Sequence, residues 1–147
     1  MPSRTATAEW HGNLTQGQGT ITRTGSGAFS HLPISWEART ERSNGKTSPE
    51  ELLAAAHAAC FAMAFSNNLN QAGHAPDALQ VQATCTFDKK PEGGWKVGTM
   101  HIVVHGTVPG IDPAEFTRLA DETGQGCPIA GAIKGNVAIS VESQLNG

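Results

Sequence analysis

Apolar residues recur at helical spacing between Ser48 and Gln71, and this is the clearest pattern in the chain. The positions that follow the spacing are Leu52, Leu53, Ala56, Cys60, Met63 and Ala64, and alanines fill most of the other positions. Ser48 and Pro49 supply an N-cap and a first-turn proline, and Glu51 completes a capping box. The pattern predicts a helix that runs to about Gln71 and stops at Gly73. Because this helix is apolar on nearly every face, we expect it to be central.

Alternating apolar and polar residues predict strands on both sides of this helix. Three short strands are expected before it, at Thr5–Trp10, Gly19–Thr24 and Pro33–Ala38. Three more are expected after it: a hairpin of Leu79–Asp88 with Trp95–Val108, and a closing strand at Val137–Leu145.

Two further helices are expected between the hairpin and the closing strand. One is capped by Asp112 and ends near Gly124, and the other covers Pro128–Lys134. Blocks of strands with segregated helices favour an α+β fold, with antiparallel sheets packed around the central helix, over a parallel doubly wound sheet. The length of 147 residues is typical of one domain, so we expect residues 1–147 to form a single domain.

Charge and composition exclude several function classes. A net charge of −3 gives no electrostatic basis for binding nucleic acid or an anionic membrane. The start of the chain lacks the apolar core of a signal peptide, and the apolar stretch Leu52–Phe65 is shorter than the roughly 20 residues of a membrane span. Three cysteines do not make a disulfide framework. We therefore expect a cytoplasmic protein whose cysteines are catalytic, metal-binding or simply buried.

Cys60 and Cys127 carry the candidate chemistry. Cys127 precedes Pro128, which fits a first helical position, so Cys127 is expected at a helix N-cap where amides and the helix dipole lower a thiol pKa. Cys60 lies on the main apolar stripe and would need a nearby cation to favour its thiolate.

Several neighbouring residues are candidates for supporting roles or for none. The cation beside Cys60 could be His57 one turn away, but the loop residues Arg39, Arg42 and Lys46 are better candidates, because arginine stays charged. Cys85 shares a strand face with Val81 and Phe87, which indicates core packing. No Cys-x-x-Cys pair is present, so neither a zinc site nor a thioredoxin-like dithiol is expected, and no cofactor motif was found.

At this point the motifs resemble the OsmC/Ohr family, and its OsmC branch in particular. Thr47–Phe61, which reads TSPEELLAAAHAACF, is similar to the family's helix signature, and Gly126–Pro128 is similar to the segment around its second cysteine. Ala8–Gly12, His31–Arg39 and Val108–Asp112 resemble the OsmC branch. The similarity covers essentially the whole chain.

The resemblance implies a thiol peroxidase that reduces organic hydroperoxides and forms an intertwined homodimer. It implies that Cys60 is the peroxidatic cysteine, that Cys127 is the resolving cysteine, and that Arg39 and Glu50 form the pair that activates Cys60. The loop between Arg39 and Glu50 leaves Arg42 as a possible substitute. The resemblance also implies a dithiol reductant, of the lipoyl type.

Helix geometry adds one constraint to these expected roles. Glu50 and Cys60 are ten residues apart, which is about 15 Å along a helix axis and beyond the reach of a glutamate side chain. A shared site would therefore take Glu50 from a second subunit across a two-fold axis, or connect it with Cys60 only through a long intermediary. Two alternatives to the enzyme stay open: a non-enzymatic module of the same fold that binds a small apolar ligand or senses redox state, and a protein whose cysteines are only core residues.

Overall fold

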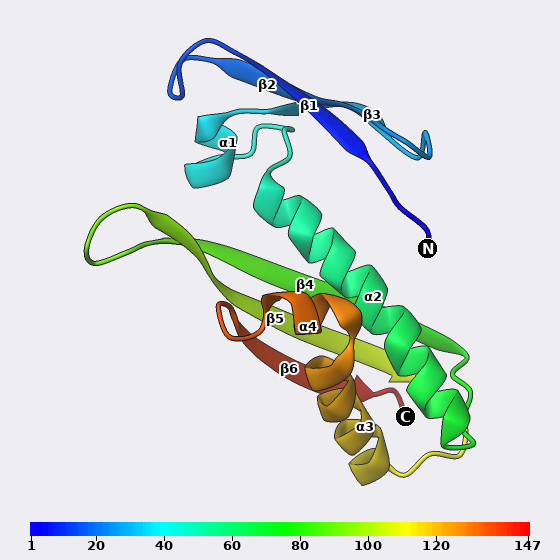
Figure 1. The fold of residues 1–147 in the computed structure, drawn as a ribbon. Helices are drawn as coiled ribbons and strands as arrows, with labels where there is room; N and C mark the ends of the chain where they lie inside the picture. Colours follow the sequence, from blue (N-terminus) through cyan, green and yellow to red (C-terminus); the bar gives the residue numbers. More distant parts are fainter. The chain divides into compact units, whose positions relative to one another are not determined.

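The computed structural model describes residues 1–147, which fall into two compact units, Met1–Leu52 and Leu53–Gly147. Each unit contains its own three-stranded sheet (Figure 1). The first sheet holds the N-terminal strands and the second holds the long hairpin and the last strand. This α+β arrangement, with two small sheets and a long helix, confirms the predicted fold class. The expectation that residues 1–147 form a single domain stays a prediction.

The first unit is an antiparallel sheet followed by a short helix. Its strands are β1 (Ala6–His11), β2 (Gln18–Thr24) and β3 (Ser30–Ile34), which lie in the order β1-β2-β3. The helix α1 (Trp36–Thr40) follows β3 directly. None of the buried apolar side chains of the protein comes from this unit, so its sheet has no covered core within one chain.

The predicted strand Pro33–Ala38 was wrong in its second half, because a helix begins there. The hydroxyl of Ser35 accepts a hydrogen bond from the amide of Ala38 at 3.1 Å, which makes Ser35 the N-cap of α1. A five-residue helix is too short to produce a periodic pattern that competes with strand alternation.

The long helix α2 spans Pro49–Gln71, as the sequence predicts. The Ser48 hydroxyl accepts from the amide of Glu51 at 3.1 Å, so the predicted cap is present. The Glu51 carboxylate accepts instead from the hydroxyl of Thr47 at 2.8 Å. The helix ends at Gln71, and the φ of 88° at Gly73 allows the amide of His74 to donate back to Leu69 at 2.9 Å.

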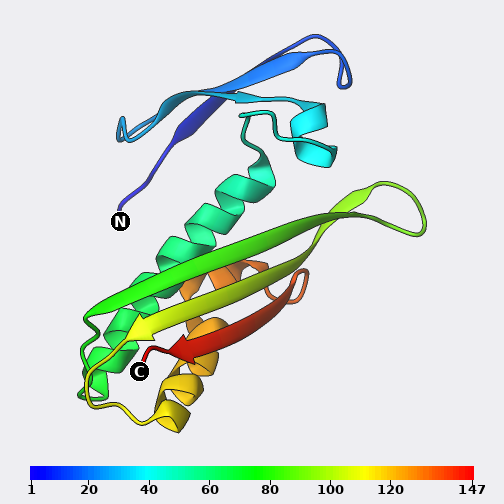
Figure 2. The same ribbon diagram turned by 180° about the vertical axis from the view of Figure 1, so that it is seen from behind.

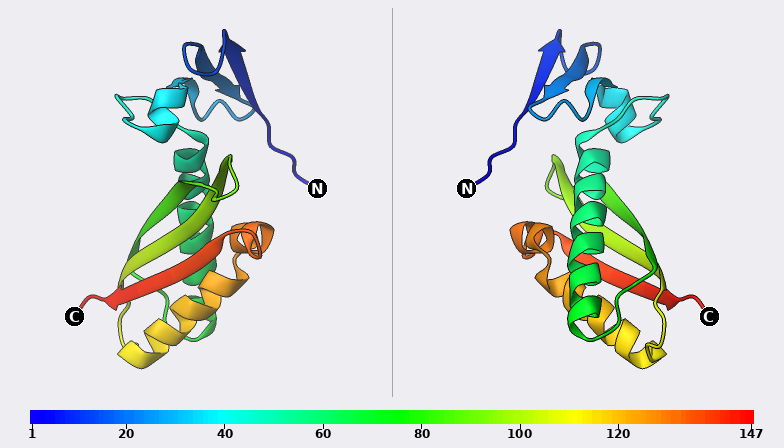
Figure 3. Two further views of the ribbon diagram at one scale, coloured as in Figure 1. Left: turned by 90° about the vertical axis from the view of Figure 1, so that its left-hand side faces the viewer. Right: turned by 90° about the vertical axis from the view of Figure 1, so that its right-hand side faces the viewer.

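The second unit is built on a sheet in the order β4-β5-β6, formed by β4 (Ala78–Lys89), β5 (Trp95–Thr107) and β6 (Ala138–Leu145). From Leu53 onward, α2 lies on one face of this sheet together with α3 (Pro113–Gly126) and α4 (Pro128–Ile133), while the other face is open (Figure 2). The side views show the same arrangement, with α2 and α3 on the same side of the strands (Figure 3).

One pairing in this sheet differs from the antiparallel sheets that the sequence predicts. The strands β4 and β5 form an antiparallel hairpin, but β5 and β6 run parallel. The chain leaves the end of β5 and returns through α3 and α4 to the beginning of that strand, as a helical crossover requires. The bridge between Lys134 and Val137 lies in the short connection from α4 to β6, so α4 ends close to the start of β6.

The core lies between this sheet and the helices. Phe61, Phe65 and Leu69 of α2 are fully buried, as are Met100 and Ile102 of β5. The rings of Phe65 and Phe116 pack at 5.2 Å between centroids, which joins α2 to α3. Burial of side chains of this size contributes roughly 1.5–3 kcal/mol each, so this cluster is the main source of stability in the second unit.

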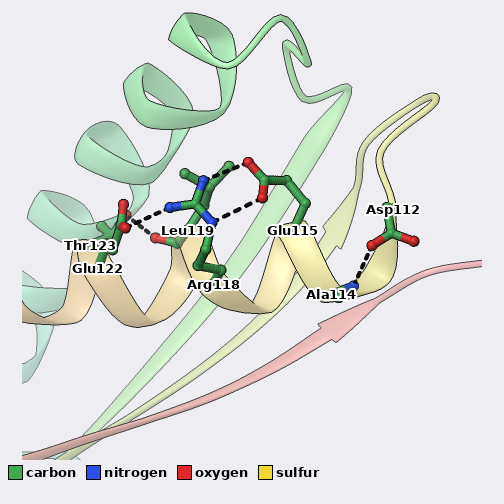
Figure 4. A network of polar contacts seen from close by, with 7 residues as sticks. All are labelled: Asp112, Ala114, Glu115, Arg118, Leu119, Glu122 and Thr123. Carbon is green, nitrogen blue, oxygen red and sulfur yellow. Dashed lines mark hydrogen bonds and ion pairs between the residues drawn. The ribbon is translucent and has the colours of Figure 1, made fainter.

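The open side of the helix α3 carries a cap and a set of ion pairs. Asp112 caps it by accepting from the amide of Ala114 at 3.2 Å, and Arg118 binds the carboxylates of Glu115 and Glu122, each at 2.6 Å (Figure 4). The hydrogen bond from Arg118 holds the pKa of the Glu115 carboxyl below its usual value. These exposed pairs contribute little stability, so α3 depends mainly on its buried face.

In one chain α2 is covered on one side only, which differs from the expected burial on nearly every face. Phe61 and Phe65 face the core, whereas Ala55, Ala59 and Met63 are exposed, and Met63 retains 70% of its surface. Pro49–Gln71 is long and apolar enough to cross a membrane by length and composition alone, but its buried side belongs to the protein's own core. A stripe of small apolar residues on α2 therefore remains open in the single chain.

His57 is the one core position on α2 that carries a titratable group. Its side chain is fully buried, and neither ring nitrogen has a hydrogen-bond partner. Burial lowers the pKa of His57 below its ordinary value of 6.5, because the charged ring would lose its hydration. The neutral ring is therefore the form that the folded protein accommodates.

We expect His57 to make the protein less stable as the pH falls below 6.5. The unfolded chain binds the His57 proton at a higher pH than the folded chain, so acid favours unfolding through this residue. Urea unfolding at pH 7.5 and pH 5.5 measures the loss. In His57→Leu the difference between the two pH values should be smaller than in the wild type. An equal difference in both proteins would contradict the argument.

Candidate active site

The two predicted redox cysteines meet at the start of α4. The amide of Ile129 donates to the sulfur of Cys60 at 3.5 Å, and the amide of Ala130 donates to the sulfur of Cys127 at 3.5 Å. Cys60 comes from the fourth turn of α2, and Cys127 precedes α4 in the chain. One helix start therefore holds both thiols, although 66 residues separate them in the sequence.

Cys127 takes this place because it joins two helices. Its amide donates to the carbonyl of Thr123 at 3.0 Å and closes α3, while its side chain caps α4. Its backbone is extended, with φ −66° and ψ 146°, so the chain turns sharply between the two helices. Pro128 then opens α4 at a position where its missing N–H costs nothing.

The pKa of the Cys127 thiol is raised, which contradicts the lowered pKa expected for a cysteine at an N-cap. Only 1% of Cys127 is exposed, and burial is the largest cause of the shift. The amide of Ala130 lowers the pKa, but the nearby Cys60 side chain raises it further. Desolvation outweighs the helix start here because the thiolate would be cut off from water.

The two thiols differ in their access to solvent. Cys60 is half-buried, whereas only 1% of Cys127 is exposed. All three cysteines are unbridged in this structure. A half-buried cysteine beside a protonated, enclosed thiol is an arrangement that allows one sulfur to react first and the other to follow.

The first unit contains the predicted arginine–carboxylate pair. Arg39, on α1, binds Glu50, in the first turn of α2, through two nitrogens: Nε lies 2.9 Å and Nη2 2.8 Å from Oε1. The Nε atom also lies 3.2 Å from Oε2. The Glu50 side chain is only 7% exposed, so the guanidinium is the group that satisfies its charge. The pair fixes the direction of the Arg39 side chain.

The structure distinguishes between the two candidate arginines by their contacts. Arg39 holds Glu50, whereas Arg42 lies on the exposed loop after α1. The geometry favours Arg39 as the arginine of the expected pair. Its role in activating Cys60, and the catalytic roles of Glu50 and Cys127, stay predictions.

The other residues that the sequence offered as candidates for a catalytic or metal site do not form one. His57 is buried and its neutral form is favoured, so it does not supply the cation expected near Cys60. Cys85 packs against the core cluster, in agreement with its predicted role. No group of three or more His, Cys, Asp or Glu side chains is arranged to hold a metal ion.

Sequence reasoning did not identify the amides of Ile129 and Ala130 as a shared contact for both sulfurs. The available signal was Pro128 directly after Cys127, which locates a helix start but does not reveal what else contacts it. The contact with Cys60 depends on how α2 packs beside α4, and that is a tertiary property.

Comparisons of the sequence and of the structure with known proteins point to the same family. The model of one protein family, described as OsmC-like protein, matches residues 42–142. Peroxiredoxin OsmC of Escherichia coli (strain K12) is 34% identical over 135 residues, which is 92% of each chain. The organic hydroperoxide resistance protein of Xanthomonas axonopodis pv. citri (strain 306) is 36% identical over 97 residues, which is 65% of each chain. The crystal structure of the organic hydroperoxide resistance protein OhrB of Bacillus subtilis superposes with a TM-score of 0.73 at 25% identity, covering 95% of this chain and 98% of that one.

We expect Cys60 to be alkylated faster than Cys127 at neutral pH. Two variants isolate the thiols: Cys85→Ser with Cys127→Ser leaves Cys60, and Cys60→Ser with Cys85→Ser leaves Cys127. Because Cys127 is enclosed and its pKa is raised, iodoacetamide at pH 7 should modify Cys127 at least roughly tenfold more slowly than it modifies Cys60. The same reaction in urea should remove the difference. Similar rates in the folded variants would mean that Cys127 is not protected.

Proposed function

This chain belongs to the family of OsmC-like proteins, and we propose that it is a thiol peroxidase that reduces organic hydroperoxides to alcohols. The observation that carries the proposal is the convergence of the Cys60 and Cys127 sulfurs on the amides that open α4. Two thiols held at one helix start can be oxidised to a disulfide without a large change of the fold. The names of its relatives, a peroxiredoxin and an organic hydroperoxide resistance protein, support the same chemistry.

In the proposed reaction the Cys60 thiolate attacks the distal oxygen of the hydroperoxide. An S–O bond forms, the O–O bond breaks, and the alkoxide leaves and takes up a proton to give the alcohol. Cys60 becomes a sulfenic acid. The Cys127 thiol then attacks the Cys60 sulfur, an S–S bond forms, and the hydroxyl leaves with the thiol proton as water. A dithiol reductant returns the two electrons that the disulfide requires, and we propose that it is of the lipoyl type.

The raised pKa of Cys127 suits a resolving cysteine. Its thiol stays protonated at neutral pH, so it does not compete with Cys60 for the hydroperoxide. It lies beside Cys60, so a sulfenic acid formed there meets a thiol before it meets a second peroxide molecule. This proximity limits overoxidation to the sulfinic acid.

Arg39 and Glu50 complete the proposed site from a second subunit. Glu50 and Cys60 are ten residues apart on α2, which is about 15 Å along the helix axis. Two chains related by a two-fold axis would allow the pair of one chain to approach Cys60 of the other. The guanidinium would then favour the thiolate and stabilise the charge that develops on the leaving oxygen.

The exposed apolar surfaces support this homodimer. Ala55, Ala59 and Met63 form an open stripe on α2, and the small alanines permit close approach of a second chain. In the first unit, Ile21 and Leu32 lie on one face of a sheet that has no covered core. Both surfaces are costly to leave in water, and a symmetric contact between two copies would cover them. The fold is that of a soluble α+β protein, and we propose that it works in the cytoplasm.

The two cysteines should have separable roles in a peroxide-consumption assay. Cys60→Ser should lose all peroxidase activity, because the nucleophile is absent. Cys127→Ser should complete the first turnover, then stall and become overoxidised at Cys60. Stopped-flow kinetics with one equivalent of cumene hydroperoxide, followed by mass spectrometry, measures both steps. An equal loss of the first turnover in both variants would overturn these roles, and Cys85→Ser serves as the control.

A heterodimer tests the composite site. Glu50→Ala and Cys60→Ser should each be impaired as homodimers, because each lacks one part of every site. A heterodimer of the two variants would contain one site with both residues and one site with neither, so it should recover about half of the wild-type activity. Co-expression with two different tags allows this species to be purified. Absence of any recovery in a pure heterodimer would show that Glu50 does not act across the subunits.

A further inference from the structure

The helix α4 depends on the two thiols for the hydrogen bonds at its start. Its amides at Ile129 and Ala130 donate to the sulfurs of Cys60 and Cys127, each at 3.5 Å. The helix spans only six residues, Pro128–Ile133, and Ala130 is the one that is buried. A helix of this length has too few internal hydrogen bonds to be stable by itself. The contacts of its first amides therefore contribute a large part of its stability.

The end of α3 is anchored by bonds that do not involve sulfur. The hydroxyl of Thr123 donates to the carbonyl of Leu119 at 2.7 Å (Figure 4), and it accepts from the side-chain amide of Asn68 on α2 at 2.8 Å. The carbonyl of Thr123 accepts from the amide of Cys127 at 3.0 Å. Thr123 is buried, so water does not compete for these bonds. None of them depends on the oxidation state of the cysteines.

A disulfide between the two cysteines would weaken the sulfur contacts of α4. A thiol sulfur offers its lone pairs to an amide, and a thiolate also offers its charge. When the disulfide forms, each sulfur gains a second heavy-atom neighbour, loses that charge and turns toward the other sulfur. The amides of Ile129 and Ala130 then lose the partners that satisfy them in the reduced protein.

We propose that the cysteine pair is a redox-dependent cap, which holds the first turn of α4 in the reduced protein and releases it when the disulfide forms. This inference rests on the proposed peroxidase function and adds a regulation of the same site. In the reduced protein Cys127 is enclosed, so the peroxide meets Cys60 alone. In the oxidised protein the released turn uncovers the disulfide, so a dithiol reductant reaches it. The bond from Asn68 to Thr123 confines the movement to α4.

The reduction of the disulfide then follows the opening of α4. One thiolate of the reductant attacks a sulfur of the pair, the S–S bond between Cys60 and Cys127 breaks, and a mixed disulfide forms. The second thiol of the reductant closes its own disulfide and releases the cysteine. Two electrons and two protons pass to the protein, and both sulfurs return to the amides. The rate of reduction should therefore depend on how easily the first turn of α4 opens.

Two neighbouring positions change the stability of α4 in opposite directions without changing either thiol. Gly131 is exposed, and a Cβ atom added there would meet no atom within 4 Å, so Gly131→Ala should strengthen the helix. Ala132 is also exposed, and Ala132→Gly should weaken the helix through the greater freedom of glycine. The two variants are therefore matched controls for each other.

The kinetic test measures both halves of the cycle in these variants. The disulfide forms are prepared with diamide, and reduction by dihydrolipoamide is followed by trapping the free thiols for mass spectrometry. Gly131→Ala should slow the reduction about fourfold, and Ala132→Gly should accelerate it about fourfold. The first turnover of the reduced proteins with cumene hydroperoxide should stay the same. Unchanged reduction rates overturn the proposal, and so does an equal effect on both halves of the cycle.

Hydrogen exchange measured by NMR tests the cap directly, in the full-length Cys85→Ser protein. In the form oxidised with diamide, the amides of Ile129 and Ala130 should exchange about fivefold faster, or more, than in the reduced form. The amide of Cys127, which donates to Thr123, should keep its rate. Equal exchange in the two forms overturns the proposal. A rise at Cys127 that matches the rise at the other two amides overturns the confinement to α4.

Two substitutions of Cys127 separate the cap from the disulfide. Cys127→Ser keeps an acceptor at the N-cap, so the amide of Ala130 should stay protected from exchange. Cys127→Ala has no acceptor there, so this amide should exchange about fivefold faster although no disulfide is present. Equal protection in the two variants would show that the side chain at this position does not hold α4.

Two oxidants used side by side separate failure of this inference from failure of the proposed function. Diamide oxidises the two thiols without any peroxidase activity, whereas cumene hydroperoxide does so only through the proposed reaction. Loss of amide protection with diamide, but no disulfide after cumene hydroperoxide, would overturn the function and keep the redox-dependent cap. A disulfide formed by cumene hydroperoxide without loss of protection at Ile129 and Ala130 would keep the function and overturn the cap.

Discussion

The arrangement of the active thiols depends on the hydrogen bonds at the start of α4. Two successive amides, from Ile129 and Ala130, are used by two sulfurs from distant parts of the chain. Amides at a helix start have no partner within the helix, so they are available to side chains. Cys127 occupies the N-cap position itself, and the packing of α2 beside α4 brings Cys60 to the next amide. A change that moved the start of α4 by one residue would separate the two thiols.

The same geometry explains why the two cysteines are not equivalent. Both accept from backbone amides, but one is enclosed and the other is half-exposed. Burial raises the pKa of Cys127 more than the helix start lowers it, because the loss of hydration of a thiolate is larger than the gain from the amides of Ala130 and Ile129. An N-cap position therefore does not by itself make a reactive thiol. We propose that solvent access decides which of the two neighbouring cysteines meets the peroxide.

The sequence predicted the elements with strong local signals and missed those set by tertiary contacts. The bounds of α2 could be predicted because Ser48, Pro49 and Gly73 fix both ends through local hydrogen bonds. The parallel pairing of β5 and β6 could not, since it depends on the path of the crossover. The pairing of Arg39 with Glu50 was expected only from the family resemblance.

The distance between the arginine pair and the thiols is the constraint that leads to our proposal of a composite site. Glu50, in the first turn of α2, holds the guanidinium of Arg39 at 2.8 Å, whereas Cys60 lies ten residues later on the same helix. The helix rise separates these two residues by about 15 Å, which is more than a glutamate side chain can span. We therefore propose that the guanidinium that favours the Cys60 thiolate comes from a second chain. The exposed apolar stripe on α2 offers a surface on which that chain could pack.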